Sequence, residues 1–225
     1  MLQKAVVNGR LHAVLKPALE ASLLCRDFSE DELIRMLEES DTRLQSFAKG
    51  EFVFRQEDEV RFVYILVSGL LAVCKDSEDG RRHIVTRIER PGDLFAEVYA
   101  FIPAGHYDYY AETQKKSLVL AIPKGYFDGR ATASPVRELM MSNMLSVLAT
   151  KAFYLNSRLY VLGGGSIREK VLRLLEQQQT DTAHFMTREE LADSLGVSRP
   201  ALSRELMRML DEGLITMDGK GIGLP

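Results

Sequence analysis

The sequence predicts an α+β fold in three successive parts: a domain of short strands, one long helix, and a small helical domain that ends in a hairpin. Short runs rich in β-branched and aromatic residues, separated by glycines and charges, occupy residues 44–127. An unbroken apolar stripe follows, and then two short amphipathic segments around a glycine. We therefore place the three parts at residues 1–133, 134–162 and 163–225.

The composition is ordinary for a globular protein. Hydrophobic residues make up 46% of the 225 residues and charged residues 27%. No apolar run is long enough to cross a bilayer, and residues 1–20 lack the apolar core and cleavage site of a secretory signal. We expect a cytoplasmic protein with no membrane partner.

The sequence offers no metal-binding pattern. Cys25 and Cys74 lie far apart, and two thiols cannot form a thiolate-only zinc or iron–sulfur site within one chain. A disulfide between them stays open, although a reduced pair fits better. Haem ligation by His83 or His106 also stays open, so the cofactor is left unassigned. The histidines, which show no metal-ligand spacing, are His12, His83, His106 and His184.

The strand-rich part predicts a small sandwich or barrel, because many short strands alternate with regular turn signals. No βαβ alternation appears, which argues against a doubly wound nucleotide-binding fold. The predicted strands are Phe52–Phe54, Phe62–Val67, Leu70–Cys74, His83–Ile88 and Ser117–Ile122, and the glycines that punctuate this part are Gly50, Gly69, Gly80, Gly92 and Gly105.

Two helices are predicted before the strands. Ser29 and Glu32 have the spacing of a capping box, which predicts a helix over Glu30–Glu39. A second helix is expected around Leu11–Leu24, limited by Pro17.

A long helix is predicted from Ser134 to Leu162. Seven positions with spacings that alternate between four and three are all apolar, and their mean period of 3.5 is that of a coiled-coil seam. A second, largely apolar stripe lies beside them at Met140, Met144, Val147 and Tyr154. A helix that is buried only in its own domain needs one apolar stripe, and this helix has two. We therefore expect one stripe to form the seam of a homodimer and the other to pack on the β-domain. The seam residues are Met141, Leu145, Leu148, Ala152, Leu155, Leu159 and Leu162.

Three glycines, Gly163–Gly165, end the long helix, because glycine extends a helix only at a cost. Ser166 and Glu169 then have the capping-box spacing that opens another helix. The glycines fit either a simple helix end or a hinge between two domains.

The most specific local pattern lies in residues 185–224. Thr187–Glu190 is a capping box before a short helix, and Gly196 supplies the turn that follows it. Ser198 can cap a second helix, with Pro200 in its first turn. This is the arrangement in which the second helix enters the major groove of DNA. Residues 214–219 add a predicted hairpin wing.

The positive charge of this region is local. The whole chain has a net charge of −3, and residues 163–225 carry 8 Lys and Arg against 10 Asp and Glu. Residues 199–208 alone carry three Arg against one Glu, on the outward side of the second helix. We expect Arg204 to bind guanine through two hydrogen bonds, Arg199 to contact a base or a phosphate, and Ser203 to contact either weakly. A merely solvated helix is the simpler alternative. The predicted DNA-contacting residues are Thr187, Ser198, Arg199, Pro200, Ser203, Arg204 and Arg208.

From about Phe28 onward the chain resembles the CRP/FNR family of bacterial regulators. Glu89–Glu97 is similar to the family's P-G-D-x-F-G-E cassette, and Gly50, Gly69 and the segment Glu189–Arg199 also fit. The resemblance implies a β-roll (jelly roll) of the cyclic-nucleotide-binding type, a long dimerisation helix and a winged helix-turn-helix. It further implies a homodimer on palindromic promoter DNA, effector binding that repositions the reading helices, activation of transcription, and RNA polymerase as a partner.

Departures from the family predict that cyclic AMP is not the effector. Tyr107 and Asp108 stand where cyclic-nucleotide-binding members carry an Arg-Ser pair, and a carboxylate repels a phosphate. Ala96 replaces the cassette glycine. The cysteine cluster of oxygen-sensing members is missing. Pro200 stands where many members carry a base-reading Glu, which leaves the half-site sequence open.

The resemblance thus implies an unidentified small effector between the roll and the long helix, although packing or surface roles explain the same residues. A β-roll sensor that regulates a partner protein instead of DNA is the alternative function, and the charged outward face of the second helix disfavours it. Nothing resembles a nucleophile with its base or a P-loop, so we expect no enzyme. The candidate effector contacts are Glu97, Tyr99, His106, Tyr107 and Tyr109, with Asn143 facing them.

Overall fold

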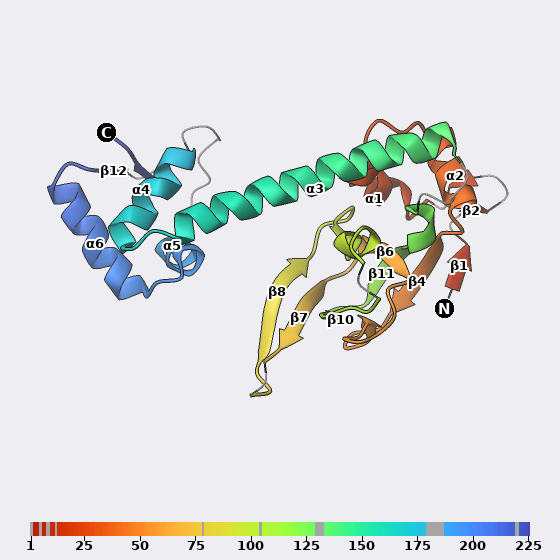
Figure 1. The fold of residues 1–225 in the computed structure, drawn as a ribbon, viewed down its shortest axis with the longest axis horizontal. Coiled ribbons are helices and arrows are strands. Elements are labelled where there is room, and N and C mark those ends of the chain that lie inside the picture. Colours follow the sequence, from red (N-terminus) through yellow and green to blue (C-terminus); the bar gives the residue numbers. More distant parts are fainter. Residues whose placement is uncertain are drawn as a thin grey trace. The chain divides into compact units, whose positions relative to one another are not determined.

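A computed structural model describes residues 2–4, 6–7, 10–11, 13–77, 79–103, 105–128, 133–178, 187–218 and 221–225. The chain forms two compact units, residues 1–148 and residues 149–225 (Figure 1). In the described parts of the chain, no helix combines the length and the hydropathy needed to pass through a lipid bilayer.

The first unit is built around two antiparallel sheets. Within the described residues, one sheet has the strand order β1-β4-β11-β6-β9 and the other the order β5-β10-β7-β8. The first sheet contains β1 (Leu2–Lys4), β4 (Arg43–Phe47), β11 (Ser117–Pro123), β6 (Phe62–Ser68) and β9 (Leu94–Phe95). The second contains β5 (Phe52–Phe54), β10 (Tyr110–Thr113), β7 (Leu71–Asp76) and β8 (Arg82–Ile88), and β2 (Val6–Val7) pairs separately with β3 (Arg10–Leu11).

The first sheet separates two hydrophobic clusters, and strand β6 contributes side chains to both of them. Its side chains alternate between the two faces, as in any strand. Val63, Ile65 and Val67 join one hydrophobic cluster, whereas Tyr64 and Leu66 join another. The second cluster also takes side chains from the facing sheet, and it is therefore the interior of the β-roll.

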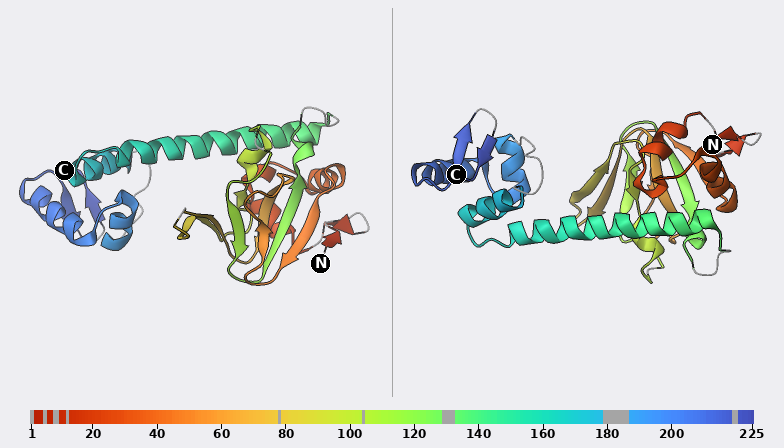
Figure 2. Two further views of the ribbon diagram at one scale, coloured as in Figure 1. Left: turned by 60° about the horizontal axis from the view of Figure 1, so that its bottom comes forward. Right: turned by 90° about the horizontal axis from the view of Figure 1, so that it is seen from above.

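The first cluster lies under helices on the outer face of this sheet (Figure 2). Helices α1 (Lys16–Ala21) and α2 (Glu30–Glu39) contribute to it, as does the beginning of α3 (Pro135–Leu162). Met140, Met144 and Val147 are each at most 5% exposed there. These three residues confirm that the second apolar stripe of α3 packs on the β-domain, whereas Tyr154 of the same stripe is 62% exposed.

Most predicted elements of this unit are confirmed. Helix α2 has the predicted bounds, and Ser29 and Glu32 form the predicted capping box. All five predicted strands are present with ends shifted by at most two residues, and β1, β2, β3, β4, β9 and β10 are additional. The predicted helix over Leu11–Leu24 is wrong in extent, because α1 covers six residues and a short 3-10 helix follows at Leu23–Cys25. Pro17 lies in the first turn of α1, where it limits the helix on its N-terminal side. Two further 3-10 helices are Glu97–Ala100 and Lys124–Tyr126.

Beyond the end of α3, the described residues of the second unit form three short helices and a hairpin. These are α4 (Ile167–Gln178), α5 (Arg188–Leu195), α6 (Arg199–Asp211), β12 (Thr216–Asp218) and β13 (Gly221–Gly223). Their apolar faces meet in one cluster that also includes Val161 from the end of α3. The predicted wing is therefore present as a β12–β13 pair, and its turn residue Gly219 lies outside the described residues.

Two side chains of α4 form hydrogen bonds with backbone carbonyl groups near the end of α3. Arg173 donates from Nη1 to the carbonyl oxygen of Tyr160 at 2.6 Å, and Gln177 donates to the carbonyl oxygen of Ser157 at 3.3 Å. The compact units divide inside α3, after Leu148, and not at the glycines that the sequence analysis used as a boundary. The three-part division and the hinge at Gly163–Gly165 stay predictions.

Candidate functional site

Helix α6 buries one side and exposes the other. Ser198 occupies the N-cap position, and Pro200 lies in the first turn, where no backbone donor is required. Leu202, Leu206 and Met209 are fully buried against α4 and α5. The opposite face exposes Arg199, Pro200, Arg204, Met207 and Arg208, with Ser203 half-buried at its edge.

The three arginines of this face differ in what they already bind. Arg199 lies 4.0 Å from a carboxylate oxygen of Glu189, and Arg208 lies 3.7 Å from one of Glu205. Arg204 forms no hydrogen bond or ion pair with any residue that the structure describes, and it is exposed. Its guanidinium is therefore available to an external acceptor.

The turn between α5 and α6 is formed by a glycine, as the sequence predicts. Gly196 ends α5 in the left-handed conformation, with φ of 63°, which glycine adopts without steric cost. Thr187 and Glu190 form the predicted capping box at the start of α5. The Ser198 side chain, in contrast, makes no capping hydrogen bond, so its exposed hydroxyl is not used by the helix.

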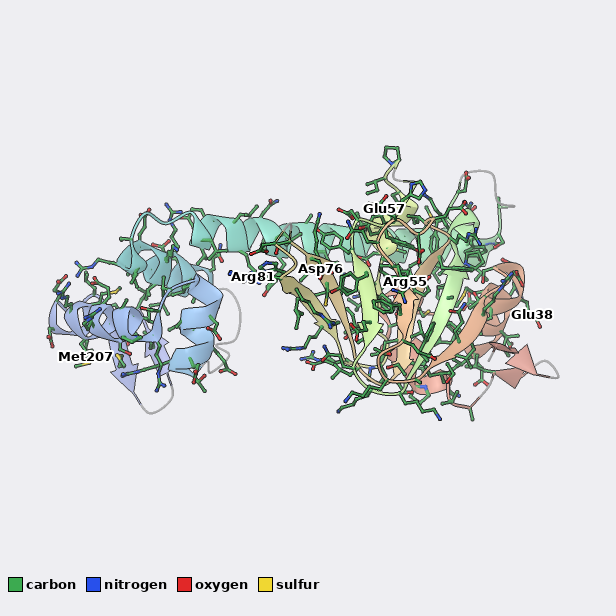
Figure 3. The ribbon with its side chains drawn as sticks, turned by 90° about the horizontal axis from the view of Figure 1, so that it is seen from below. Glu38, Arg55, Glu57, Asp76, Arg81 and Met207 are labelled. Atoms are coloured by element: carbon green, nitrogen blue, oxygen red, sulfur yellow. The ribbon has the colours of Figure 1, made fainter. Side chains whose placement is uncertain are left out.

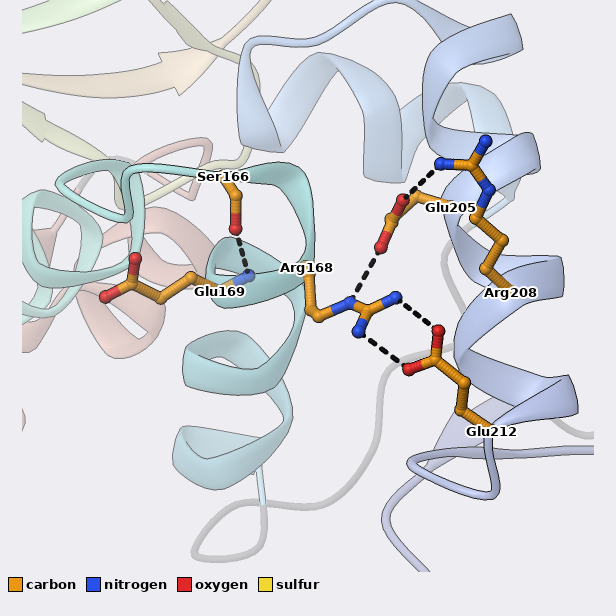
Figure 4. A network of polar contacts seen from close by, with 6 residues as sticks. All are labelled: Ser166, Arg168, Glu169, Glu205, Arg208 and Glu212. Atoms are coloured by element: carbon orange, nitrogen blue, oxygen red, sulfur yellow. Dashed lines mark hydrogen bonds and ion pairs between the residues drawn. The ribbon is translucent and has the colours of Figure 1, made fainter.

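A network of ion pairs fixes α6 on α4 (Figure 4). Arg168 of α4 donates from Nε to Glu205 at 2.8 Å and from its two terminal nitrogens to Glu212 at 2.7 and 2.9 Å. Glu205 also faces Arg208. Glu205 of α6 thus pairs with Arg168 of the neighbouring helix, which leaves positive charge on the outer face of α6.

The interior of the β-roll is filled by aromatic rings. Tyr107 is 2% exposed, and its ring centroid lies 4.0 Å from that of Phe54 and 5.0 Å from that of Tyr99. Tyr64 stacks on Phe95 at 5.2 Å. Burial raises the pKa of both Tyr64 and Tyr107, so these hydroxyls stay protonated. Tyr107 donates to the carbonyl oxygen of Phe62 at 2.9 Å. The ring itself occupies the space that the two sheets enclose.

Asp108 follows Tyr107 at the edge of this core. Its carboxylate accepts a hydrogen bond from the hydroxyl of Tyr99, and Nζ of Lys75 lies 3.8 Å away. Burial first, and then the bond to Asp108, raise the pKa of Tyr99. Asp108 stands in the part of the chain where cyclic-nucleotide-binding relatives carry the phosphate-binding Arg-Ser pair. This chain thus has a carboxylate there, which already interacts with Tyr99 and Lys75.

Ala96 shows the conformation that the cassette glycine would favour. Its φ is 60° and its ψ is 12°, a left-handed geometry that costs an L-residue free energy. The next residue, Glu97, is only 3% exposed. Ala96 therefore adopts a backbone conformation that a glycine would adopt without steric cost.

The six predicted effector contacts are not all brought together. Glu97, Tyr99 and Tyr107 belong to the roll. His106 is exposed, and its backbone forms an isolated antiparallel β-bridge with that of Glu59. Tyr109 is half-buried, with Nζ of Lys75 over its ring. Asn143 does not face them, which corrects the prediction.

Asn143 lies across the first sheet from the roll interior, at the helix-covered core. It donates to the carbonyl oxygens of Leu24 and Arg26 at 3.1 and 2.8 Å. Its neighbours on α3, Met140 and Met144, pack in that same core. The amide thus anchors the segment after α1, because those carbonyls need a donor in a buried place.

The predicted seam of α3 is the most exposed apolar stripe among the described residues. Leu145 is 70% exposed, Leu155 59% and Leu159 66%. Met141 and Leu148 are half-buried because they also contact the helix-covered core. Ala152 and Leu162 are exposed as well. Apolar surface of this extent on one helix is unusual unless another surface covers it.

No candidate metal site is found in the described parts of the chain, where no three His, Cys, Asp or Glu side chains are grouped to hold an ion. His12 and His184 lie outside the described residues. Cys25 and Cys74 are buried and form no disulfide, and burial raises the pKa of the Cys25 thiol to about 12.

Sequence reasoning missed two residues of the DNA-facing unit. Arg168 lies 44 positions from Glu212, a separation at which no local pattern signals a contact. Met207 is 48% exposed on the outer face of α6. Its position three residues after Arg204 and seven after Pro200 could have placed it there.

Two protein families match successive parts of the chain. Residues 44–131 match the family described as "Cyclic nucleotide-binding domain", and residues 169–225 match the "Crp-like helix-turn-helix domain". The division agrees with the β-roll and the helix-turn-helix described above. The chain is thus an α+β protein with a nucleotide-binding-type roll and a DNA-binding domain.

Whole-chain similarities agree with these matches. The regulatory protein HlyX of Actinobacillus pleuropneumoniae is 30% identical over 214 residues, which cover 89% of this chain and 86% of that protein. The CRP-like cAMP-activated global transcriptional regulator of Mycobacterium tuberculosis is 26% identical over 188 residues, 78% of this chain and 81% of that protein. The crystal structure of DNR from Pseudomonas aeruginosa has the same fold, with a TM-score of 0.52, 20% identity and 96% of each chain covered. The chain belongs to the CRP/FNR family of bacterial transcription regulators.

Proposed function

We propose that this regulator binds a specific DNA sequence as a homodimer and that α6 is its reading helix. The observation that carries the proposal is Arg204, an exposed guanidinium without a partner among the described residues, in the middle of the outer face of α6. Its planar fork matches the O6 and N7 acceptors of guanine. The ion pairs of Arg168 support this role, because they hold α6 in one orientation.

The other predicted contacts surround Arg204. Arg199 and Arg208 have weak, long ion pairs that a phosphate can replace. Ser198 and Ser203 offer hydroxyls on the same side, and Thr187 lies at the positive N-terminus of α5. Pro200 packs against DNA without donating a hydrogen bond, so the half-site differs from that of relatives with Glu there.

The exposed stripe of α3 supports the homodimer. Two copies that bury this stripe in a parallel coiled coil would repeat the same leucine contacts on both helices. A two-fold dimer would offer its two α6 helices to half-sites about one helical turn apart, which favours a palindromic site.

The β-roll supports gating by a small effector other than cyclic AMP. Tyr107 fills the roll interior, and Asp108 would repel a cyclic phosphate. The proposed contacts are Glu97, Tyr99, His106, Tyr107 and Tyr109, and Asn143 is left out. The family relationship favours an activator that contacts RNA polymerase in the cytoplasm.

Binding to duplex DNA tests the proposal. A labelled duplex is selected from a random pool by the full chain, with and without a low-molecular-weight extract of the source organism, and affinity is measured by fluorescence anisotropy. Arg204→Ala should weaken binding about 10- to 100-fold, because it removes one bidentate hydrogen-bonded contact with a base. Arg87→Ala, which removes an exposed arginine of β8, is the matched control and should leave affinity unchanged.

The salt dependence separates DNA from a protein partner. Wild-type affinity for the duplex should fall steeply as salt rises, because phosphate contacts release counterions. If Arg204→Ala binds the selected duplex as tightly as wild type, α6 is not the reading helix. If no duplex is enriched, and the protein binds another protein independently of salt, the β-roll regulates a partner protein instead.

A further inference from the structure

Met207 is an apolar side chain at a place where a DNA-reading helix needs no apolar residue for folding. It is 48% exposed, whereas Met209, two residues on, is fully buried. From Ile167 to the C-terminus, Met207 and Leu214 are the exposed large hydrophobic residues among those described. Figure 3 shows Met207 at the surface of α6. The exposed side chain of Met207 therefore does not contribute to the hydrophobic core of this domain.

The position of Met207 connects it with Arg204. At 100° per residue, Pro200, Arg204, Met207 and Asp211 fall within about 60° of one another around α6. All four are exposed. The stripe therefore presents, from the N-terminus, an apolar ring, a guanidinium, an apolar thioether chain and a carboxylate.

The charges along this stripe limit which part can approach DNA. Asp211 lies one turn beyond Met207, and its carboxylate would be repelled by phosphates. Arg204, three residues before Met207, and Arg208, the residue after it, are also exposed. Met207 is thus the last residue of the stripe that a major groove can accommodate, and cations flank it.

We propose that Met207 reads the C5-methyl group of a thymine in the major groove, one or two base pairs from the base contacted by Arg204. The inference rests on the proposed function of α6. Three helical residues advance about 4.5 Å along the axis, and one base pair advances about 3.4 Å, which sets this spacing. The thymine methyl is the apolar group that base edges offer in the major groove, and Met207 is the apolar group that the reading face offers.

Deoxyuridine tests the contact directly, because it lacks the methyl group and keeps the base pairing of thymine. Each thymine of one half-site in the selected duplex is replaced in turn, and affinity is measured for wild type, Met207→Ala and Met207→Leu. At one position, deoxyuridine should weaken wild type about fourfold, the effect of one buried methyl-sized group. The same replacement should leave Met207→Ala unaffected and should still weaken Met207→Leu.

Two further variants complete the experiment. Arg204→Ala should retain the deoxyuridine effect, because it removes contact with a different base pair. Leu214→Ala, which removes the other exposed large apolar side chain described from Ile167 onward, should behave as wild type. Circular dichroism of each variant checks that the helices are intact.

If deoxyuridine reduced the affinity of wild type and of Met207→Ala by the same factor at every position, the inference would be overturned. The DNA-binding proposal would still stand. It would also be overturned if Met207→Ala kept full affinity for every duplex and lost binding to a protein such as RNA polymerase. Failure of wild type to bind any duplex would instead overturn the proposed function.

Discussion

Arg168 and Glu212 form a two-point ion pair, with Nη1–Oε2 and Nη2–Oε1 distances of 2.7 and 2.9 Å. The pair joins the first turn of α4 to the residue that caps the end of α6. Since Nε of Arg168 also binds Glu205, one guanidinium holds α6 at two places. The flat, forked shape of arginine makes this possible, and lysine cannot reproduce it.

We predict that Arg168→Ala loosens α6 without affecting the β-roll. Hydrogen exchange of the full chain, followed by mass spectrometry, should show faster exchange in peptides of α4 and α6. Arg168→Lys should restore little of the protection, because an ammonium group is a single point charge. Arg81→Ala is the control, since it breaks an ion pair whose partners are 81% and 57% exposed. Equal protection in Arg168→Ala and wild type would show that the network contributes nothing to α6.

Ala96→Gly should stabilise the β-roll by about 0.5–1 kcal/mol. Ala96 has φ of 60°, a conformation in which glycine avoids the steric cost of a Cβ atom, although glycine loses more entropy on folding. Urea unfolding followed by tyrosine fluorescence measures this unit, which holds all of the eight tyrosines except Tyr154 and Tyr160.

Ala21→Gly provides the matched control for that experiment. Ala21 ends α1 in an ordinary right-handed conformation, so the same substitution should destabilise by up to about 1 kcal/mol. Destabilisation by both changes would mean that the left-handed geometry at Ala96 carries no strain.

Stability should fall as the pH rises above about 10. Burial is the largest cause that raises the pKa of Tyr64, Tyr99 and Tyr107, and it raises those of Tyr110 and Tyr126 to about 12. Between the unfolded pKa of about 10 and the folded values, the unfolded chain loses these protons while the folded chain keeps them. The folded state then binds more protons, so the free energy of unfolding decreases with pH.

Urea unfolding at pH 8 and at about pH 11 measures this decrease, and tyrosinate absorbance of the native protein should lag behind that of the unfolded chain. Tyr107→Phe removes one of the five groups and should flatten the pH dependence. A free energy of unfolding that stays constant over this range would contradict the prediction.

Leu155→Glu should convert the proposed homodimer into a monomer. Leu155 is 59% exposed in the single chain, and burial of a leucine contributes about 2 kcal/mol in each copy. Losing both should raise the dissociation constant by at least about a hundredfold. Sedimentation equilibrium measures it, with Val85→Glu on the exposed strand β8 as the control. A wild-type chain that sediments as a monomer at micromolar concentration would disprove the seam.

Short-range patterns were sufficient for several elements. The capping boxes at Ser29 and Thr187 join residues three apart, and Gly196 needs a left-handed turn, so local geometry alone determines them. The exposed leucines of α3 and the buried Met140 and Met144 were likewise separated by helical periodicity.

The sequence by itself thus determined where most helices and strands lie, which side of α3 and α6 is apolar, and which arginines face outward. Tertiary structure alone decided which distant groups meet: Asn143 with the carbonyls of Leu24 and Arg26, Arg168 with Glu212, and Tyr107 inside the roll. Periodicity tells which face of an element is buried but not what covers that face. Contacts between residues far apart in the chain depend on how whole elements pack, and no short stretch of sequence contains that information.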